Sequence, residues 1–379
     1  MTASTLALHG AAKRLDDLQT PCLVLDRGIL ARNLRAMAAA LARHGVPLRP
    51  HMKTAKSIHV ARLALAGQPG GITVSTLAEA EYFAGHGITD ILYAVGITPS
   101  KLDRVAALRR AGADVLVITD DPATAAAIAA HPAGLGALAE VDSGEHRGGL
   151  TPNSPRLLEV AARLGPALRG VMTHGGHSYA GRTAADMAAV AEQERTAAVG
   201  AADRLRAAGH RVGIVSAGSS PTALHARHLD GVTEVRAGVY MFGDLFQASV
   251  GTHRQEDIAL TVLASVIGLR PAEHRLLVDA GGLALSKDRS TQPTTDLGFG
   301  LMLDMQGRPA HGRSVVAQAY QEHGVVALDP ALPFPDLPVG ALVRIAPNHA
   351  CMTAAAHDRY WVVDGSDAVT AEWPRVNGW

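Results

Sequence analysis

The sequence predicts an α/β protein in which a (β/α)₈ barrel is followed by a mainly antiparallel β domain. Between residues 20 and 250, short apolar segments alternate about eight times with alanine-rich segments of helical periodicity. This alternation is typical of parallel sheets covered by helices, and eight units suit a closed barrel better than an open sheet. No Gly-x-Gly-x-x-Gly pattern follows the first apolar segment, which argues against a dinucleotide-binding fold.

The barrel elements are expected in regular order, beginning with a strand over Cys22–Asp26 and a helix over Gly28–His44. The further strands are expected at Pro47–Arg49, Gly71–Ser75, Ile91–Val95, Val115–Thr119, Gly136–Asp142, Leu168–His174, Arg211–Ser216 and Val232–Tyr240. Helices are expected between them at Ser57–Ala66, Leu77–Gly85, Lys101–Ala111, Ala123–Ala130, Pro155–Leu164, Ala184–Ala208 and Pro221–His228.

After residue 251 the pattern changes to apolar segments punctuated by Gly, Pro and Asp, with almost no helical periodicity. These strands are expected at Ile258–Gly268, Arg275–Asp279, Ser314–Ala319, Val325–Leu328, Leu342–Ala346 and Tyr360–Val363. The predicted domains are therefore a barrel over residues 20–250 and a β-rich domain over 251–379, to which residues 1–19 are expected to add a strand.

Composition excludes several classes of protein. The 379 residues are 47% hydrophobic and 18% charged, which argues against disorder, and 35 basic residues balance 35 acidic ones. No bulk charge therefore favours nucleic acid or an anionic membrane. The longest apolar run, Ile258–Leu269, covers about a dozen residues where a membrane span needs about 20. With no evident signal peptide and only Cys22 and Cys351, the sequence predicts a cytoplasmic protein without disulfides.

Polar residues are expected at the carboxyl ends of the barrel strands, where such barrels place their catalytic groups. They are His51, Lys53, Ser75, Thr76, Arg147, Thr173, His174, the segment 216–222 and the segment 236–240. A desolvated Lys53 amine could act as a nucleophile, whereas an ordinary exposed lysine is the alternative. The small residues of Ser216–Thr222 suit a phosphate cradle, and an ordinary Gly/Ser loop explains them equally well.

A second group of chemically active residues lies in Pro347-Asn348-His349-Ala350-Cys351. On a strand, residues two apart point to the same face, so His349 and Cys351 could share one cation. An imidazole with a thiolate favours a borderline-soft ion, zinc first, with manganese or cobalt as alternatives. A buried cysteine beside a hydrogen-bonded histidine is the reading without a metal.

The stretch Arg49-Pro50-His51-Met52-Lys53-Thr54 resembles the Schiff-base lysine motif of the fold-type III pyridoxal phosphate enzymes. Together with GITVSTLAEAE, TDILYAV, SPTAL, LDGVTEVRAGVY, QEHG and PNHAC, in this order along the chain, it resembles the metal-dependent D-serine dehydratase / D-threonine aldolase family, in particular its bacterial dehydratase branch. The resemblance implies an alanine-racemase-like barrel followed by a β domain, and a homodimer.

The resemblance also assigns roles to individual residues. It makes Lys53 the lysine that holds pyridoxal 5′-phosphate, and Arg147 the arginine near the phenolic oxygen of the cofactor. His174 would pack against the pyridine ring, and Arg236 would face the ring nitrogen. The phosphate would be held by Ser219, Ser220, Gly238 and Tyr240. His349 and Cys351 would be the metal pair.

The implied reaction is the elimination of water from a β-hydroxy-D-amino acid such as D-serine, D-threonine or threo-3-hydroxy-D-aspartate, giving a 2-oxo acid and ammonia. Retro-aldol cleavage to glycine and an aldehyde is the alternative within the family. Aldolase-like members tend to have His-x-Asp at the metal pair and a histidine beyond the ring-packing position. This chain has His-x-Cys there and Tyr179 at the second position, although His177 is close by.

Two other classes of function stay open. A pyridoxal phosphate-binding protein without turnover would lack the β domain that carries His349 and Cys351. An amino-acid racemase would need a second base such as Tyr320 or Tyr360, which stand in no recognisable pattern. Glu322 and His323 precede a predicted strand and could support the site or form a simple turn. Cys22 is expected to be a buried packing residue.

Overall fold

The computed structural model describes residues 13–379, and the chain divides into two compact units. The β unit comprises the described residues up to Leu30 together with Ile258–Pro374. The barrel unit comprises Ala31–Asp257 and Arg375–Trp379, so helix α1 (Arg27–Ala42) contains the division. The domain boundaries predicted at 20–250 and 251–379 stay a prediction.

The barrel unit contains one sheet of eight parallel strands, in the order β2-β9-β8-β7-β6-β5-β4-β3. Its strands are β2 (Leu48–Pro50), β3 (Ile72–Val74), β4 (Asp90–Gly96), β5 (Asp114–Thr119), β6 (Gly136–Val141), β7 (Leu168–Thr173), β8 (Ile214–Ala217) and β9 (Glu234–Ala237). The two end strands meet through a parallel bridge between His51 and Thr73, and the Met52 amide donates to the Thr73 carbonyl at 2.7 Å. The sheet is therefore a nearly closed barrel, and the predicted fold class is confirmed.

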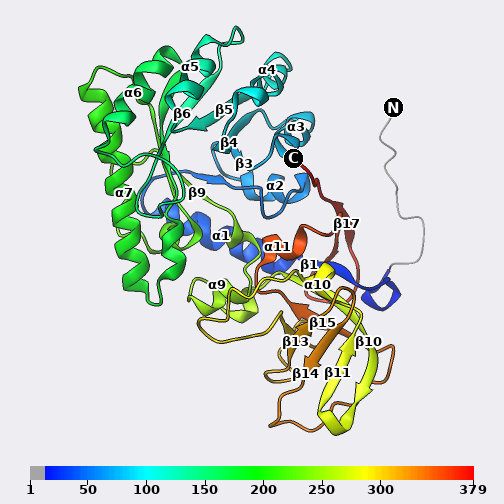
Figure 1. The fold of residues 1–379 in the computed structure, drawn as a ribbon. Helices are drawn as coiled ribbons and strands as arrows, with labels where there is room; N and C mark the ends of the chain where they lie inside the picture. Colours follow the sequence, from blue (N-terminus) through cyan, green and yellow to red (C-terminus); the bar gives the residue numbers. More distant parts are fainter. Residues whose placement is uncertain (1–12) are drawn as a thin grey trace. The chain divides into compact units, whose positions relative to one another are not determined.

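Helices follow the barrel strands. They are α2 (Ile58–Leu65), α3 (Leu77–Gly85), α4 (Leu102–Arg110), α5 (Pro122–Ala130), α6 (Pro155–Leu164), α7 (Ala184–Ala207), α8 (Ser220–His225) and α9 (Leu245–Ser249). Figure 1 shows α3 to α7 around the outside of the sheet. Several begin where the sequence supplies a cap, because Thr76, Asp121 and Thr183 each accept a hydrogen bond from an amide of the first turn.

The β unit is built on six antiparallel strands that close on themselves, since β11 pairs with both β14 and β10. The strands are β10 (Leu260–Arg270), β11 (Arg275–Val278), β12 (Leu301–Leu303), β13 (Val315–Ala319), β14 (Gly324–Ala327) and β15 (Leu342–Ala346). Three further strands extend the sheet beyond β10, namely β1 (Cys22–Asp26), β16 (Arg359–Val363) and β17 (Ala371–Pro374). Two short helices, α10 (Gly282–Leu285) and α11 (Ala350–Ala354), complete this unit.

The prediction that Cys22–Asp26 is the first barrel strand is wrong. This segment is β1, which pairs antiparallel with β10 and parallel with β16 in the β unit. All five of its residues are buried, and such a continuous apolar run suits a central strand of either sheet. Local sequence therefore established that a buried strand forms there but left its partners undetermined. The first barrel strand is instead β2.

The predicted strand in residues 1–19 falls partly outside the described residues, which begin at 13. Within 13–19 the chain forms a short 3₁₀ turn over Leu15–Asp17 and an isolated bridge between Arg14 and Ala368 instead of a strand. Among the described helices, none combines the length and the apolar composition needed to cross a membrane.

Each unit has its own apolar core. The barrel interior contains a cluster formed by Leu92, Leu116, Ile118, Leu138 and Met172, contributed by strands β4 to β7. In the β unit, Cys22 packs in a cluster with Leu15 and Leu263, which confirms that it is a buried residue. Burial raises the pKa of the Cys22 thiol to about 12, so the side chain stays an uncharged packing group.

We expect Leu138→Ala to lower the free energy of unfolding by about 2–5 kcal/mol, because it leaves a cavity in a fully buried cluster. Chemical denaturation checks this value. The matched control is Val95→Ala in β4, whose side chain is 44% exposed and whose effect should stay within about 0.5 kcal/mol. Equal losses in the two variants would contradict the assignment of Leu138 to the barrel core.

Candidate active site

The residues predicted for the site gather at one end of the barrel. Lys53 follows β2, Arg147 follows β6 and His174 follows β7. The remaining positions are Ser219 and Ser220 after β8, Arg236 within β9, and Gly238 and Tyr240 just beyond β9. Because the strands are parallel, their carboxyl ends share one rim, and these side chains come from neighbouring points on it. The structure thus assembles the predicted set, while the roles assigned to its members stay a prediction.

Lys53 lies in a turn that is fixed on both sides. The His51 amide donates to the Ala237 carbonyl at 2.8 Å, and the Lys56 amide donates to the Met52 carbonyl at 2.7 Å. Lys56 has a left-handed backbone (φ 49°), and its amine forms an ion pair with the buried Glu79 at 3.3 Å. The Lys53 side chain itself is exposed, so a rigid turn presents an accessible amine.

His174 is held in one tautomer. Its Nδ1 lies 2.9 Å from the carbonyl oxygen of Gly218, and since a carbonyl only accepts, Nδ1 must carry the hydrogen. Burial and then the positive charge of Lys53 lower the pKa of His174 to about 3. Burial, followed by the charges of Lys53 and Arg236, also keeps the pKa of His51 well below its ordinary value. Two neutral imidazoles therefore flank the lysine.

Arg236 is a buried cation with defined partners. Its Nη1 donates to the Ser216 hydroxyl at 2.5 Å, and its Nη2 donates to the Thr173 carbonyl. The Ser216 hydroxyl donates in turn to the Glu234 carboxylate at 2.5 Å, which also accepts from Arg49 at 2.7 Å. Burial lowers the pKa of Arg236, while the charge of Glu234 opposes this effect. These contacts fix the guanidinium at the end of β9.

The segment Ser216–Thr222 behaves as a helix cap as well as a small-residue loop. The Ser219 hydroxyl accepts from the Thr222 amide at 3.2 Å and lies 2.9 Å from the Ser178 hydroxyl. The Ser220 hydroxyl accepts from the Tyr240 amide at 3.2 Å. A hydroxyl that accepts from an amide keeps its own O–H to donate, so these contacts are compatible with the phosphate-binding role that the resemblance gives both serines.

Gly238 and Tyr240 lie just beyond β9, and the hydroxyl of Tyr240 points to a bound group. The Tyr240 hydroxyl is buried and has no hydrogen-bond partner among the described residues. Burial raises its pKa, so the hydroxyl is protonated and can donate a hydrogen bond. Gly238 is required by close packing, because a Cβ there would lie 2.8 Å from the His51 carbonyl oxygen. The end of β9 thus lies directly against the Lys53 turn.

The remaining barrel residues are less constrained. The Arg147 side chain is 61% exposed and pairs with Glu145 at 3.2 Å. Tyr179 packs its ring against Phe246, with centroids 6.0 Å apart. Both ring nitrogens of His177 are buried without a hydrogen-bond partner in residues 13–379.

The prediction that His349 and Cys351 lie on a strand is wrong. Strand β15 ends at Ala346, His349 is the N-cap of α11, and Cys351 lies within its first turn. Alternation along a strand is therefore not what relates the two side chains. Both are partly exposed, and the His349 Nδ1 lies 3.7 Å from the Asp288 carboxylate.

Asp288 is held beside His349 by its own loop. Its carboxylate accepts from the Ser290 amide at 2.9 Å and the Ser290 hydroxyl at 2.5 Å. The Asn348 amide group donates to the backbone carbonyls of Asp288 and Gly298 at 2.9 and 2.7 Å. Burial would raise the pKa of Asp288, but the bonds from His349 and Ser290 hold it at about 2. A carboxylate next to an imidazole is a common arrangement around metal-binding histidines.

Sequence reasoning missed the acidic residues that support the site. Asp288 lies in a segment with no recognisable motif, whereas Glu234 lies within the quoted segment LDGVTEVRAGVY but was given no role there. Glu194 had a detectable signal, because it occupies an apolar position in the helical stripe of α7, whose other buried members are alanines, Met187 and Leu205. A buried carboxylate in such a stripe indicates a polar task.

Two protein-family models match the chain. The model for the alanine racemase N-terminal domain matches residues 25–245, and the model for a putative serine dehydratase domain matches residues 259–363. The chain belongs to the alanine racemase N-terminal domain family. The predicted resemblance is thereby confirmed.

Several relatives of this chain are dehydratases and aldolases, which are lyases. The chain is 44% identical to a D-threo-3-hydroxyaspartate dehydratase of Delftia sp. (strain HT23), covering 96% of this chain and 98% of that protein. It is 31% identical to a 3-hydroxy-D-aspartate aldolase of Paracoccus denitrificans, covering 94% and 92% of the two chains. A solved structure of the Delftia dehydratase superposes with a TM-score of 0.93 over 97% of this chain and all of the other, at 43% identity. The predicted enzyme class, a lyase, is confirmed.

We expect the free energy of unfolding to fall as the pH drops from about 6.5 toward 4. The pKa of His174 is about 3 in the fold and about 6.5 when unfolded, so the unfolded chain binds more protons in this window. Each such histidine contributes at most about 1.4 kcal/mol per pH unit. The free energy of unfolding, measured by chemical denaturation at each pH, should fall less steeply with pH in His174→Gln than in the unaltered protein. His86→Gln, a change at the exposed end of α3, should keep the slope of the unaltered protein. Identical slopes in all three proteins would contradict a neutral, buried His174.

Proposed function

We propose that the protein is a pyridoxal phosphate- and metal-dependent lyase that eliminates water from a β-hydroxy-D-amino acid, giving a 2-oxo acid and ammonia. The observation that carries this proposal is the 44% identity to a D-threo-3-hydroxyaspartate dehydratase over nearly the whole of both chains. The aldolase of Paracoccus denitrificans reaches 31% over a similar length. D-Serine, D-threonine and threo-3-hydroxy-D-aspartate are the candidate substrates.

The barrel residues fit pyridoxal phosphate, which family membership also supports. The rim offers an accessible lysine amine, a buried phenol hydroxyl without a partner and a serine-rich helix start. Lys53 would hold the aldehyde carbon, and Tyr240, Gly238, Ser219 and Ser220 would hold the phosphate. When bound, this cofactor supplies an electron sink for the α-carbon of an amino acid.

Other residues of the rim would set the orientation of the cofactor ring. His174 is neutral with its hydrogen on Nδ1, so it presents an uncharged face to the ring. Arg236 is fixed by Ser216 and Thr173 and would face the ring nitrogen. Arg147 would lie near the phenolic oxygen. The Lys53 amine would also take the proton from the α-carbon of the substrate.

The β unit would supply the metal. His349 and Cys351 provide one imidazole and one thiol, a donor set that favours zinc, with manganese or cobalt as alternatives. Asp288 would orient the imidazole of His349. A cysteine-to-alanine mutant of a D-threo-3-hydroxyaspartate dehydratase has been solved in a form described as metal-free, and this chain is 43% identical to it. A divalent ion would make the β-hydroxyl a better leaving group.

Retro-aldol cleavage is the second candidate function. It requires a base for the β-hydroxyl proton. His177, whose two buried ring nitrogens have no hydrogen-bond partner among the described residues, is the residue that favours it. The family resemblance further supports a homodimer, and the sparing use of cysteine supports a cytoplasmic location; both are part of this proposal.

The cofactor claim predicts an absorbance band of a protonated Schiff base when pyridoxal phosphate is added to the purified protein. Lys53→Ala should abolish this band, because it removes the amine. Lys56→Ala is the matched control, since Lys56 lies in the same turn but forms an ion pair with Glu79, and it should retain the band. A band that persists in Lys53→Ala would contradict the assignment.

The metal claim predicts that EDTA abolishes ammonia release from threo-3-hydroxy-D-aspartate, D-serine or D-threonine, and that zinc restores it. His349→Ala and Cys351→Ala should each lower the bound metal and reduce turnover by about 100-fold or more, since Lewis-acid activation contributes several kcal/mol. Metal content by mass spectrometry and parallel assays of ammonia and glycine check this. Glycine in place of ammonia would favour the aldolase, and activity insensitive to EDTA would refute the role of the pair.

A further inference from the structure

A carboxylate is buried in the middle of α7, where packing alone would call for an apolar side chain. Glu194 is 2% exposed, and the other buried residues of this helix are alanines, Met187 and Leu205. Burial raises the pKa of Glu194, although hydrogen bonds from Thr222 and backbone amides act against it. An apolar residue would pack here without the desolvation cost of a carboxylate, so the position points to a task other than core stability.

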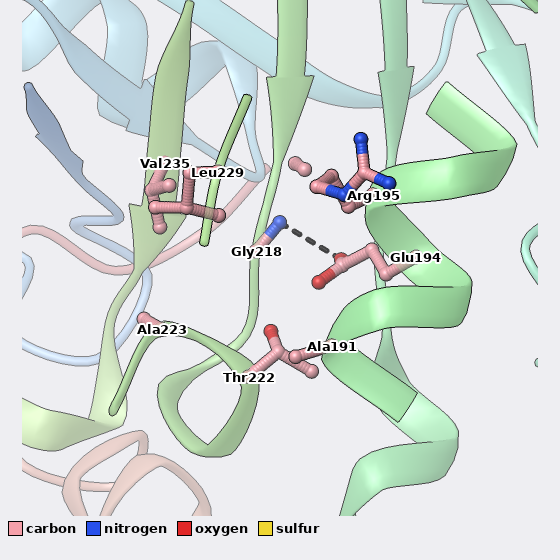
Figure 2. Close-up of a pocket in the computed structure, with 9 residues that line it drawn as sticks. Ala191, Glu194, Arg195, Gly218, Thr222, Ala223, Leu229 and Val235 are labelled. Atoms are coloured by element: carbon pink, nitrogen blue, oxygen red, sulfur yellow. Dashed lines mark hydrogen bonds between the residues drawn. The ribbon is translucent and has the colours of Figure 1, made fainter. Parts of the chain in front are cut away.

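One oxygen of this carboxylate binds two loops at once. Glu194 Oε1 accepts from the Gly175 amide at 2.5 Å and from the Gly218 amide at 2.8 Å. Figure 2 shows the carboxylate extending from α7 toward Gly218, with Thr222 and Ala223 on the segment that follows. Gly175 directly follows His174, and Gly218 directly precedes Ser219.

Both amide donors belong to glycines, and close approach explains why. A Cβ on Gly175 would lie 2.9 Å from the carboxylate carbon of Glu194. Gly218 has φ +127°, and a Cβ there would lie 2.5 Å from the Arg236 carbonyl oxygen. The backbone of Gly218 is therefore held on both sides. Its amide donates to Glu194, and its carbonyl oxygen accepts from His174 Nδ1 at 2.9 Å.

Resting on the proposed function, we infer that Glu194 is a positioning residue that fixes the distance between the two ends of the cofactor pocket. One oxygen holds the loop of His174, which would contact the ring, and the loop of Ser219 and Ser220, which would contact the phosphate. Through Gly218 it also holds the acceptor that sets the His174 tautomer. Glu194 itself would touch neither cofactor nor substrate.

The test compares the affinities of apoprotein for pyridoxal phosphate and for pyridoxal, which lacks the phosphate. For Glu194→Ala we expect the Kd for pyridoxal phosphate to rise about tenfold or more, because two hydrogen bonds to a charged acceptor are lost. The ratio of the pyridoxal Kd to the pyridoxal phosphate Kd should fall, since the phosphate loop is no longer held in register with the ring loop. The circular dichroism of the cofactor band should weaken in parallel.

Glu194→Gln and Glu192→Gln complete the series. Glu194→Gln keeps one acceptor oxygen without the charge, so its affinity should lie between those of the unaltered protein and Glu194→Ala. Glu192 lies two residues earlier, is exposed and pairs with Arg195 at 2.6 Å, so the same change there should leave both affinities unchanged. If Glu194→Ala does not fold, the comparison of the two glutamine variants decides the question.

Three results would overturn the inference. Unchanged affinities in the Glu194 variants would show that the carboxylate does not position the pocket. Equal weakening of both ligands, with an unchanged ratio, would show a general structural role instead. If the unaltered protein binds no pyridoxal phosphate, the proposed function fails, and the inference fails with it. If the unaltered protein binds pyridoxal phosphate and the Glu194 variants bind it with the same affinity, the proposed function stands and only the inference fails.

Discussion

The barrel depends on its closure between β2 and β3, which is made at the turn that carries the candidate lysine. The sheet order leaves these two strands as its ends, and the bridge from His51 to Thr73 joins them. On the other side, the His51 amide binds β9 at Ala237. The backbone contacts that complete the barrel therefore also fix the position of Lys53. Stability and placement of the amine rest on the same few hydrogen bonds.

The buried carboxylates at the rim bind other parts of the protein. Glu194 binds the amides of two loops, and Glu234 holds Arg236 through the Ser216 hydroxyl. Buried charges are costly unless they are paired or hydrogen-bonded, and here each one is satisfied by defined partners. The same surroundings keep His174 and His51 neutral beside Lys53. Rigid polar contacts thus surround the one exposed amine of this group.

In the β unit, hydrogen bonds between loops likewise fix the surroundings of His349. The loop before β12 is held by Asn348, the direct neighbour of His349, and this contact brings Asp288 to the imidazole. The residue that precedes the candidate ligand thus secures the carboxylate that would orient it. Contacts between two loops therefore bring Asp288 to His349. The strand alternation that the sequence predicted for His349 and Cys351 is absent because β15 ends at Ala346.

The sequence by itself determined the alternation of strands and helices, the candidate lysine, the rim residues and the His-x-Cys pair, because these depend on local periodicity and short motifs. It left the partners of Cys22–Asp26 undetermined, because a fully buried strand carries no information on which sheet it joins. The tertiary structure decided that β1 lies in the β unit, that His349 begins a helix, and that the Ser219 and Ser220 hydroxyls accept from the Thr222 and Tyr240 amides. It also revealed Glu194, Glu234 and Asp288, whose partners are far away in sequence. The helical stripe of α7 marked Glu194 as unusual, but its partners, like those of Glu234 and Asp288, are set by the packing of whole elements and not by a local pattern.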